Sequence, residues 1–462
     1  MRRLLLLTYY YPPCNLAPTR RVMNWVECLP GLGWRPIVVC RHWSKEEADD
    51  PASEPLRQDF LVERHATHEV HWVPYRPTPR DLVRRLAGKD RLVLLRKALT
   101  FGQLLGEKVW DALDPLDAYW ECASDLVREG HVDGVLVTGN PFNLFRTGYR
   151  LHERYGIPWA ADYRDSWSSN DLAYPAGIVS GVLRRADRLA EKHWLRSAAF
   201  FTSVSPEYVR SIRETVSRPG YTLYNGFVRA TPPPSAPVAP ESKLTVAYLG
   251  TLYPGQRIEV FLRGVLRFLQ AKGPDVRFQM LFPGITYMRG QKERVAEAIR
   301  GFEQHFSLMD RISGAEATRL QTQCHLLLQV GWQTQAGIVG SKVFEYLGSG
   351  RPLVICPSDG GVLERMVADT GVGWVLSNEA EVEALVTRLY EELLATSQVQ
   401  GPAPRPALQH YSRERQARRL ARCLDIHFVR AASSAAGATR QPSSQSTRHR
   451  PERVGPAIGR RK

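Results

Sequence analysis

The sequence of 462 residues lacks any apolar run long enough to cross a bilayer, which takes about 18 consecutive apolar residues. The apolar stretch that begins at Leu4 stops at Pro12 and is followed by no small-residue cleavage site. We therefore interpret it as a buried first strand rather than a signal peptide. This predicts a soluble protein, or one that is peripheral at the inner face of a membrane.

Paired cysteines are also absent. The chain has 7 cysteines with no C-x-x-C pair among them, and an odd number cannot all be bridged. This pattern favours free thiols in a reducing compartment, and so a cytoplasmic location.

Acidic residues are scarce relative to basic ones, with 47 Asp and Glu against 62 Lys and Arg, a net charge of +15. Residues 431–462 hold seven Lys or Arg and one Glu, so about +6 of the net charge belongs to this tail. A basic body suits phosphate-rich ligands, anionic lipid or nucleic acid. No basic and aromatic recognition module is present, and we therefore expect no nucleic acid partner.

The length predicts two or three domains. Apolar runs at Leu4–Tyr11 and Ile37–Cys40 flank a helical pattern from about Arg20 to Leu29, which predicts a parallel, doubly wound α/β sheet. Five prolines between Arg229 and Lys243 indicate a linker. We expect a first domain at 1–228, the linker at 229–243 and a second domain at 244–411. The tail at 431–462 is of low complexity, and we expect it to be disordered.

The most informative stretch is Gly340–Pro352, between buried strands at Leu326–Val330 and Leu353–Cys356. It predicts a helix with Lys342 and Glu345 near its start. Such a helix start binds anions, and open α/β sheets bind ligands beyond the carboxyl ends of their strands. A nucleotide fits, with Lys342 on phosphate and Glu345 on the ribose hydroxyls. The alternative is a surface ion pair on a helix that only packs.

Two further stretches place polar residues at strand ends. Asp165 follows a predicted strand and is suited to accept a hydrogen bond from an acceptor hydroxyl, while Arg164 is suited to neutralise a leaving diphosphate. The alternative is an internal pair of Arg164 with Asp165 or Asp162. Farther on, Gly360 and Gly361 open a helix with bare amides, which predicts an anion nest.

Four stretches together carry a family resemblance: Leu4–Pro13, Ala161–Trp167, Tyr248–Tyr253 and Ser341–Leu353. In this order they resemble nucleotide-sugar glycosyltransferases of the GT-B type, in particular those similar to glycosyltransferase family 4. The resemblance covers about residues 1–430. It implies two Rossmann-like domains facing across a cleft, with the nucleotide-sugar on the second domain and the acceptor on the first. It also implies that a helix at 412–430 crosses back to the first domain.

The resemblance also implies a donor site and an acceptor-side loop. The Gly250 turn approaches the diphosphate, and Thr251 and Arg257 occupy the positions of the family's basic pair. Only one cation is kept there, so Lys342 supplies the second. Gly337 stands where the family has the first of two glutamates, and the family's strand-end histidine is absent. The predicted set is Asp165 and Arg164 for catalysis, Pro18 and Arg20 on the acceptor side, and Gly250, Thr251, Arg257, Ser341, Lys342, Glu345, Gly360 and Gly361 for the donor.

The implied function is transfer of a sugar, hexosyltransferase-like, to a saccharide or lipid-linked acceptor, with retention of configuration, in cell-surface polysaccharide or glycolipid synthesis. The chain has no D-x-D triplet, so we expect no metal and no cofactor, the nucleotide-sugar being a co-substrate. The basic amphipathic residues 80–110 predict either contact with an anionic membrane or a helical pair packed on its own domain. A GT-B-like epimerase and a catalytically degenerate GT-B partner or scaffold are the alternatives.

Overall fold

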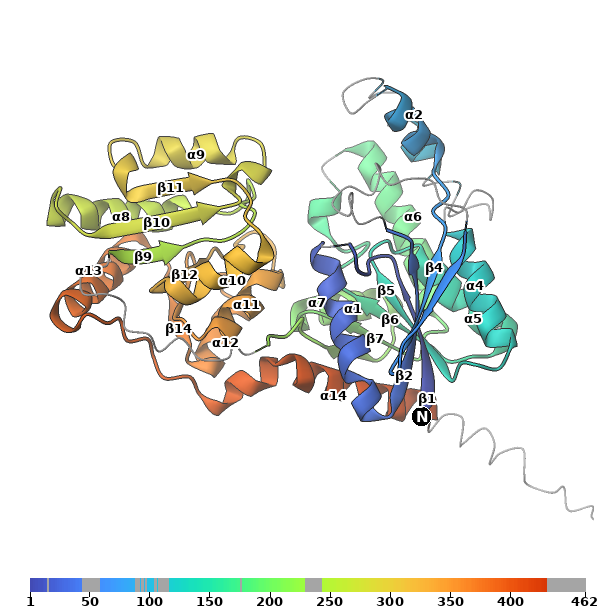
Figure 1. The fold of residues 1–462 in the computed structure, drawn as a ribbon. Coiled ribbons are helices and arrows are strands. Elements are labelled where there is room, and N and C mark those ends of the chain that lie inside the picture. The colour runs from blue at the N-terminus through green and yellow to red at the C-terminus, as the bar shows by residue number, and fades with distance from the viewer. Residues whose placement is uncertain are drawn as a thin grey trace, which may run out of the picture.

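The computed structural model describes residues 1–14, 16–43, 59–87, 92, 95, 98–103, 106, 116–174, 177–228 and 243–429. They form two α/β domains, each built on its own sheet (Figure 1). The predicted fold class, two doubly wound Rossmann-like domains, is confirmed. The linker at 229–243, apart from Lys243, the tail at 431–462 and much of 80–110 lie outside the described residues.

The first domain contains an eight-stranded sheet in the order β3-β4-β2-β1-β5-β6-β7-β8. Every neighbouring pair is parallel except β3 with β4. Its strands are β1 Arg2–Thr8, β2 Trp34–Arg41, β3 Leu61–Arg64, β4 Glu69–Val73, β5 Gly134–Gly139, β6 Trp159–Tyr163, β7 Phe200–Ser203 and β8 Gly220–Thr222.

Helices cover this sheet because its central strands are apolar on both faces, as a parallel sheet requires. Leu4 to Leu7 of β1, for example, are all fully buried. The first helix starts three residues earlier than predicted, since Pro18 is accommodated in its first turn. The helices are α1 Ala17–Cys28, α2 Pro79–Ala87, α4 Asp117–Arg128, α5 Leu144–Tyr155, α6 Ile178–Leu195 and α7 Pro206–Val216.

The second domain has a fully parallel six-stranded sheet in the order β11-β10-β9-β12-β13-β14. Its strands are β9 Leu244–Ala247, β10 Phe278–Pro283, β11 Phe306–Met309, β12 Leu326–Gln329, β13 Leu353–Ile355 and β14 Gly373–Val375. Helices pack on both of its faces. They are α8 Glu259–Lys272, α9 Gln291–Ala298, α10 Gly314–Gln323, α11 Ser341–Ser349, α12 Val362–Thr370 and α13 Glu379–Thr396.

The last described helix, α14 Arg413–Leu424, runs from the junction of the two domains along the underside of the first one and packs against it (Figure 1). Its apolar face, including Leu420 and Leu424, joins the core on one side of the first sheet. The Gln416 side chain accepts a hydrogen bond of 3.0 Å from the Tyr224 amide.

Two features of the described chain bear on the predictions made from composition. All seven cysteines are free, as their spacing predicted. In the part of the chain that the structure describes, no helix is both long and apolar enough to span a membrane.

Candidate functional site: a cation and a carboxylate at the end of the second sheet

Helix α11 begins directly after the loop that follows β12, so its first turn lies at the carboxyl end of the second sheet. Val343, Phe344 and Leu347 are buried in the domain core, as the helical pattern predicted. The N-cap residue, Gly340, contributes no side-chain cap. Burial of one face therefore leaves Lys342 and Glu345 at the edge of the core, near a helix start at the carboxyl end of the sheet.

Lys342 and Glu345 are in contact, with 2.8 Å between Nζ and Oε2. Gln321 of α10 donates to the same oxygen at 3.2 Å. Burial, together with the smaller effect of the nearby charges of Arg20 and Arg311, lowers the pKa of Lys342 to about 8. The site thus holds a partly desolvated lysine whose charge is easily stabilised by an added anion.

Arg20 of the first domain forms an ion pair with Glu345 of the second. The sequence assigned these residues to different sites, Arg20 to the acceptor side and Glu345 to the donor. The structure brings them together across the space between the two sheets. A hydrogen-bonding ligand at Glu345 would therefore compete with Arg20 for the carboxylate.

The Gly250 turn lies beside Lys342, as the predicted donor site requires. Gly250 has φ of +110°, and a Cβ there would lie 3.7 Å from Cγ of Lys342. Tyr346 of α11 fixes the end of β9, since its hydroxyl lies 2.9 Å from the Leu249 amide. Thr251 and Ser341 are half-buried at this turn and at the helix start.

Arg257 lies farther out than predicted. It is exposed and donates to Oε1 of Gln333 at 3.0 Å, and no contact joins it to Lys342 within the described chain. Arg311, which the sequence did not single out, is the arginine of the second domain whose charge reaches Lys342.

The predicted anion nest at Gly360 and Gly361 is wrong in one respect: the amides are not bare. The Asp359 carboxylate accepts hydrogen bonds from the amides of Gly361 at 3.1 Å, Leu363 at 3.0 Å and Glu364 at 3.1 Å. The Gly360 amide donates to Oγ of Ser358 at 3.0 Å. The chain thus supplies its own anion at the start of α12. Asp359 was the missed signal, because Asp is a favoured helix-capping residue.

Arg164 and Asp165 follow β6, at the carboxyl end of the first sheet. Arg164 is half-buried, and burial lowers its pKa while the charge of Asp165 opposes that shift. Asp165 is exposed. Burial and Tyr287 raise the pKa of Tyr253 in the second domain, and the charge of Asp165 adds to this shift. The charge of Asp165 therefore acts on a residue of the second domain.

The internal pair considered from the sequence exists, but with a different arginine. Asp162 of β6 binds Arg21 of α1 through two hydrogen bonds, of 2.6 Å from Nη2 and 2.9 Å from Nε. Both side chains are 1% exposed. The buried partner of Asp162 in the first domain is therefore Arg21 and not Arg164.

Gly337, at the position of the family's first glutamate, packs against the first domain. Its φ is +87°, and a Cβ there would lie 2.8 Å from Cβ of Glu207 and 2.9 Å from Oγ of Ser205. Glu207 in turn pairs with Arg365 of α12. Gly337 is therefore part of the contact between the domains, and that contact admits no side chain.

We expect Gly337→Ala to lower the free energy of unfolding by about 1–3 kcal/mol, because it adds backbone strain to a collision with α7. Gly301→Ala is the matched control, since Gly301 has φ of +85° and no heavy atom within 4 Å of an added Cβ. Denaturant unfolding measures both variants. Equal losses would show that the contact at Gly337 contributes nothing.

No protein-family model matches the chain, and no curated protein matches it in sequence. Solved structures do match over nearly the full length. Sucrose-phosphate synthase from Thermosynechococcus elongatus is 14% identical, with 95% of this chain and 99% of that chain covered and a TM-score of 0.54. The trehalose 6-phosphate synthase from Burkholderia multivorans is 12% identical, with 96% and 100% covered and a TM-score of 0.56.

A structure of HepE from Anabaena in complex with UDP and glucose is 12% identical, with 95% of this chain and 99% of that chain covered and a TM-score of 0.51. At such identities the likeness concerns the fold. The chain forms two α/β domains one after the other, each on a largely or wholly parallel sheet, and a helix near its end returns to the first domain. These features agree with the three matches. The chain therefore has the GT-B fold that its sequence predicted.

Proposed function

We propose that the protein is a glycosyltransferase that takes its sugar from a nucleotide-sugar. The observation that carries this proposal is the Lys342–Glu345 pair beside the Gly250 turn, at the carboxyl end of one sheet and opposite a second sheet. A cation, a carboxylate and an approachable backbone are what a nucleoside diphosphate needs for its phosphates and its ribose. The HepE matches, whose structures contain UDP or UDP-glucose, support UDP as the first nucleotide to test.

In this proposal the leaving diphosphate lies against Lys342 and the first amides of α11, with Ser341 at that helix start. Glu345 exchanges Arg20 for the ribose hydroxyls. Asp165 receives the hydrogen bond of the acceptor hydroxyl, and Arg164 adds positive charge as the glycosidic bond to phosphate breaks. The chain's own groups thus provide charge stabilisation without requiring a metal or a cofactor.

The acceptor, the stereochemistry and the cellular role belong to the same proposal. We propose a saccharide or lipid-linked acceptor, retention of configuration and a role in cell-surface polysaccharide or glycolipid synthesis. Contact with an anionic membrane through residues 80–110 is supported by α2, where Leu82 is 43% and Leu86 is 89% exposed. An apolar side chain so exposed next to arginines suits a membrane interface.

The first test is thermal stabilisation by UDP-, GDP-, dTDP- and CMP-linked compounds. We expect one nucleotide to raise the melting temperature and Glu345→Ala to weaken its binding by about 10- to 100-fold, as expected for loss of hydrogen bonds to a charged group. Glu391→Ala is the control, because Glu391 pairs with Lys272 on the outside of the second domain. If no nucleotide stabilises the protein, the proposed donor site is wrong.

A non-catalytic partner with the same fold is a second candidate, and Gly337 is the observation that favours it. The family's first glutamate is replaced here by a contact between the domains. The two candidates differ in turnover. A transferase consumes the stabilising nucleotide-sugar when a suitable acceptor is present, and Asp165→Ala stops it. A non-catalytic partner binds the nucleotide-sugar but does not consume it, whichever acceptor is added.

A further inference from the structure

The exposed face of α14 consists almost wholly of arginines. Arg415, Arg418, Arg419 and Arg422 are exposed, while Gln416, Ala417, Leu420 and Ala421 between them are buried. Offsets of four and seven residues place Arg419 and Arg422 on the same side of the helix as Arg415, over about 10 Å at 1.5 Å per residue, and Arg418 lies next to them. We call these four residues the arginine stripe.

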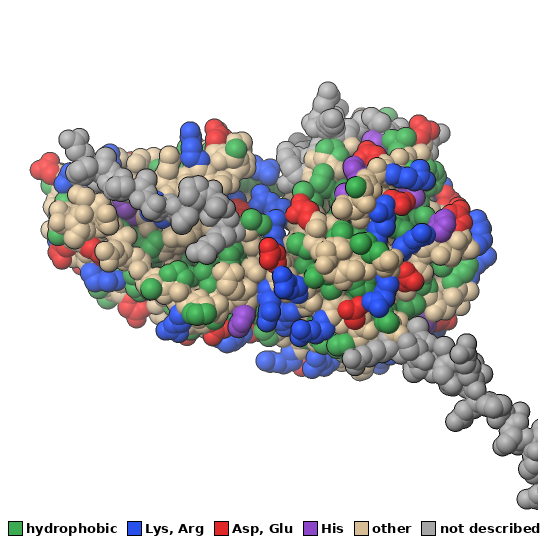
Figure 2. Space-filling model, turned by 60° about the horizontal axis from the view of Figure 1, so that its bottom comes forward, with side chains coloured by type: hydrophobic (Ala, Val, Ile, Leu, Met, Phe, Trp, Pro, Cys, Tyr) green, Lys and Arg blue, Asp and Glu red, His purple; other side chains and the backbone are tan. Residues whose placement is uncertain are grey.

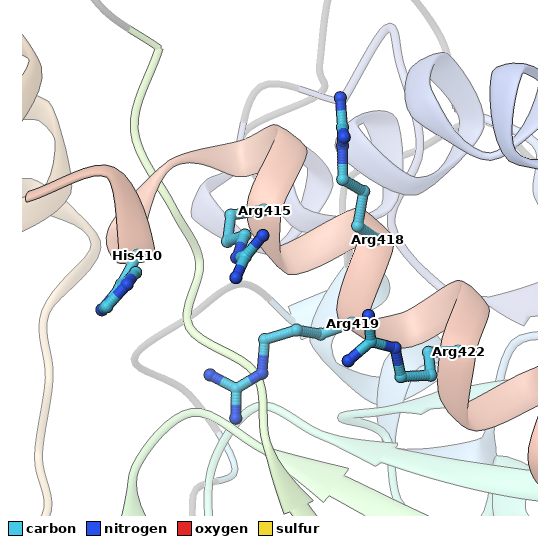
Figure 3. A pocket seen from close by; sticks show the side chains of 5 residues that line it. All are labelled: His410, Arg415, Arg418, Arg419 and Arg422. Carbon is cyan, nitrogen blue, oxygen red and sulfur yellow. The ribbon is translucent and has the colours of Figure 1, made fainter. Parts of the chain in front are cut away.

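The arginine stripe lines a surface hollow together with His410 (Figure 3). The hollow has a volume of about 370 Å³. In Figure 3 Arg415, Arg419 and Arg422 extend to the same side of α14, while Arg418 points away from them. Figure 2, with the underside of the molecule turned forward, shows Lys and Arg side chains gathered where the two domains meet. The charge is therefore concentrated at one place.

Within the described residues, no carboxylate pairs with any arginine of the stripe. Like charges three and four residues apart destabilise a helix, and Glu414 is the one acidic residue in α14. By contrast, Arg263 and Arg267, which are also exposed, both pair with Glu379. The stripe thus lacks the carboxylate partner that Arg263 and Arg267 share.

We propose that the arginine stripe is a binding site for a ligand with several phosphate groups, separate from the donor site. All four cations are arginine, whose planar guanidinium binds phosphate oxygens in pairs. A phosphate group carries up to about two negative charges, so a few of them neutralise the stripe. The stripe contacts neither Lys342 nor Glu345 in the described chain, and it serves a different molecule from the nucleotide-sugar.

Nucleic acid fits this surface poorly. Recognition of single strands relies on bases stacked against exposed aromatic rings, but the nearest aromatic residues along the chain, Tyr411 and Phe428, are both buried. The exposed apolar residue that follows the stripe is Ile426, which is 41% exposed. Phosphate groups without stacked bases, either free in solution or on lipid headgroups, are the chemistry that the surface matches.

The test uses the full chain and two probes. Sodium tripolyphosphate represents free phosphates, and vesicles of phosphatidylcholine with and without phosphatidylglycerol represent headgroups. The variant is Arg419→Gln with Arg422→Gln. Its matched control is Arg185→Gln with Arg188→Gln, which removes the same charge from two exposed arginines with the same spacing on α6. Thermal shift and co-sedimentation measure binding, and Lys342→Ala shows how much tripolyphosphate binds at the donor site.

We expect at least one probe to bind. Its affinity should fall at least about tenfold in the α14 variant, because the variant loses two arginines and each arginine near an anionic surface strengthens binding severalfold. The α6 control should retain that binding, and Lys342→Ala should lose only the share of tripolyphosphate that binds at the donor site. A response to tripolyphosphate alone identifies a free phosphate ligand, and one to anionic vesicles alone identifies headgroups. Binding to neither probe, or equal binding by the α14 and α6 variants, overturns the proposal whatever the donor site does.

Discussion

Lys342→Ala should lower the rate of sugar transfer by about 100- to 1,000-fold, the usual cost of removing a group that stabilises a developing negative charge. Lys342 is the partly buried cation beside the Gly250 turn and the start of α11. Its alanine variant leaves the leaving diphosphate with helix amides alone in the second domain. Steady-state transfer, or donor hydrolysis if the acceptor is still unidentified, measures the loss.

The structure offers a closely matched control. Lys272 pairs with Glu391 at the same distance, 2.8 Å, and its side chain is 30% exposed against 31% for Lys342. Lys272→Ala therefore removes a similar ion pair from the contact between α8 and α13, away from the start of α11. If both variants lose the same activity, the effect comes from the stability of the second domain and not from the proposed role of Lys342.

The pKa of Lys342 gives this prediction a second readout. Burial and the nearby arginines lower that pKa to about 8, so the ligand-free lysine loses its charge as the pH rises through this value. Donor affinity of the wild type should then fall between about pH 7 and 9. Lys342→Arg should keep a flatter profile, because arginine stays charged.

Stability should change with pH in the opposite direction. The unfolded chain binds the Lys342 proton more tightly than the folded protein does, because the folded pKa is the lower of the two. The free energy of unfolding therefore rises as the pH increases through about 8. Lys342→Ala should lack this rise, which denaturant unfolding at several pH values measures.

The sequence predicted what depends on local pattern. Periodicity identified the strands and the buried face of α11, and the spacing of Lys342 and Glu345 predicted their contact. The sequence pattern did not predict the roles of Gln321 and Arg311, which act on the site from other parts of the second domain. Nor did it predict that Arg20 would pair with Glu345, since that contact depends on how the two domains sit against each other.

Two other differences have separate physical reasons. The glycine pattern predicted free amides at Gly361, because glycine leaves backbone amides accessible. The pattern does not show whether a neighbouring carboxylate already accepts a hydrogen bond from them, as Asp359 does. The sequence alone does not show whether Arg21 or Arg164 pairs with Asp162. Only the packing of α1 on β6 determines that Arg21 binds Asp162, and that Arg164 is left at the sheet edge.

Asp162→Ala should lower the free energy of unfolding by about 3–5 kcal/mol, because it leaves the Arg21 charge buried without its partner. Asp162 also accepts a hydrogen bond of 2.5 Å from the Thr202 hydroxyl. Burial alone would raise the pKa of Asp162, but the charge and hydrogen bonds of Arg21 hold it below its usual value. This contribution to stability is present at neutral pH and is lost as the pH falls below the ordinary range for aspartate.

Two comparisons separate this structural role from a catalytic one. Arg21→Met with Asp162→Ala removes both charges, so it should be more stable than Asp162→Ala alone. Asp165→Ala changes an exposed carboxylate three residues away, so it should unfold within about 0.5 kcal/mol of the wild type while losing transfer activity. If Asp162→Ala unfolds like Asp165→Ala, the buried pair does not support the first domain. If Asp165→Ala keeps full transfer, the acceptor hydroxyl is held by another group.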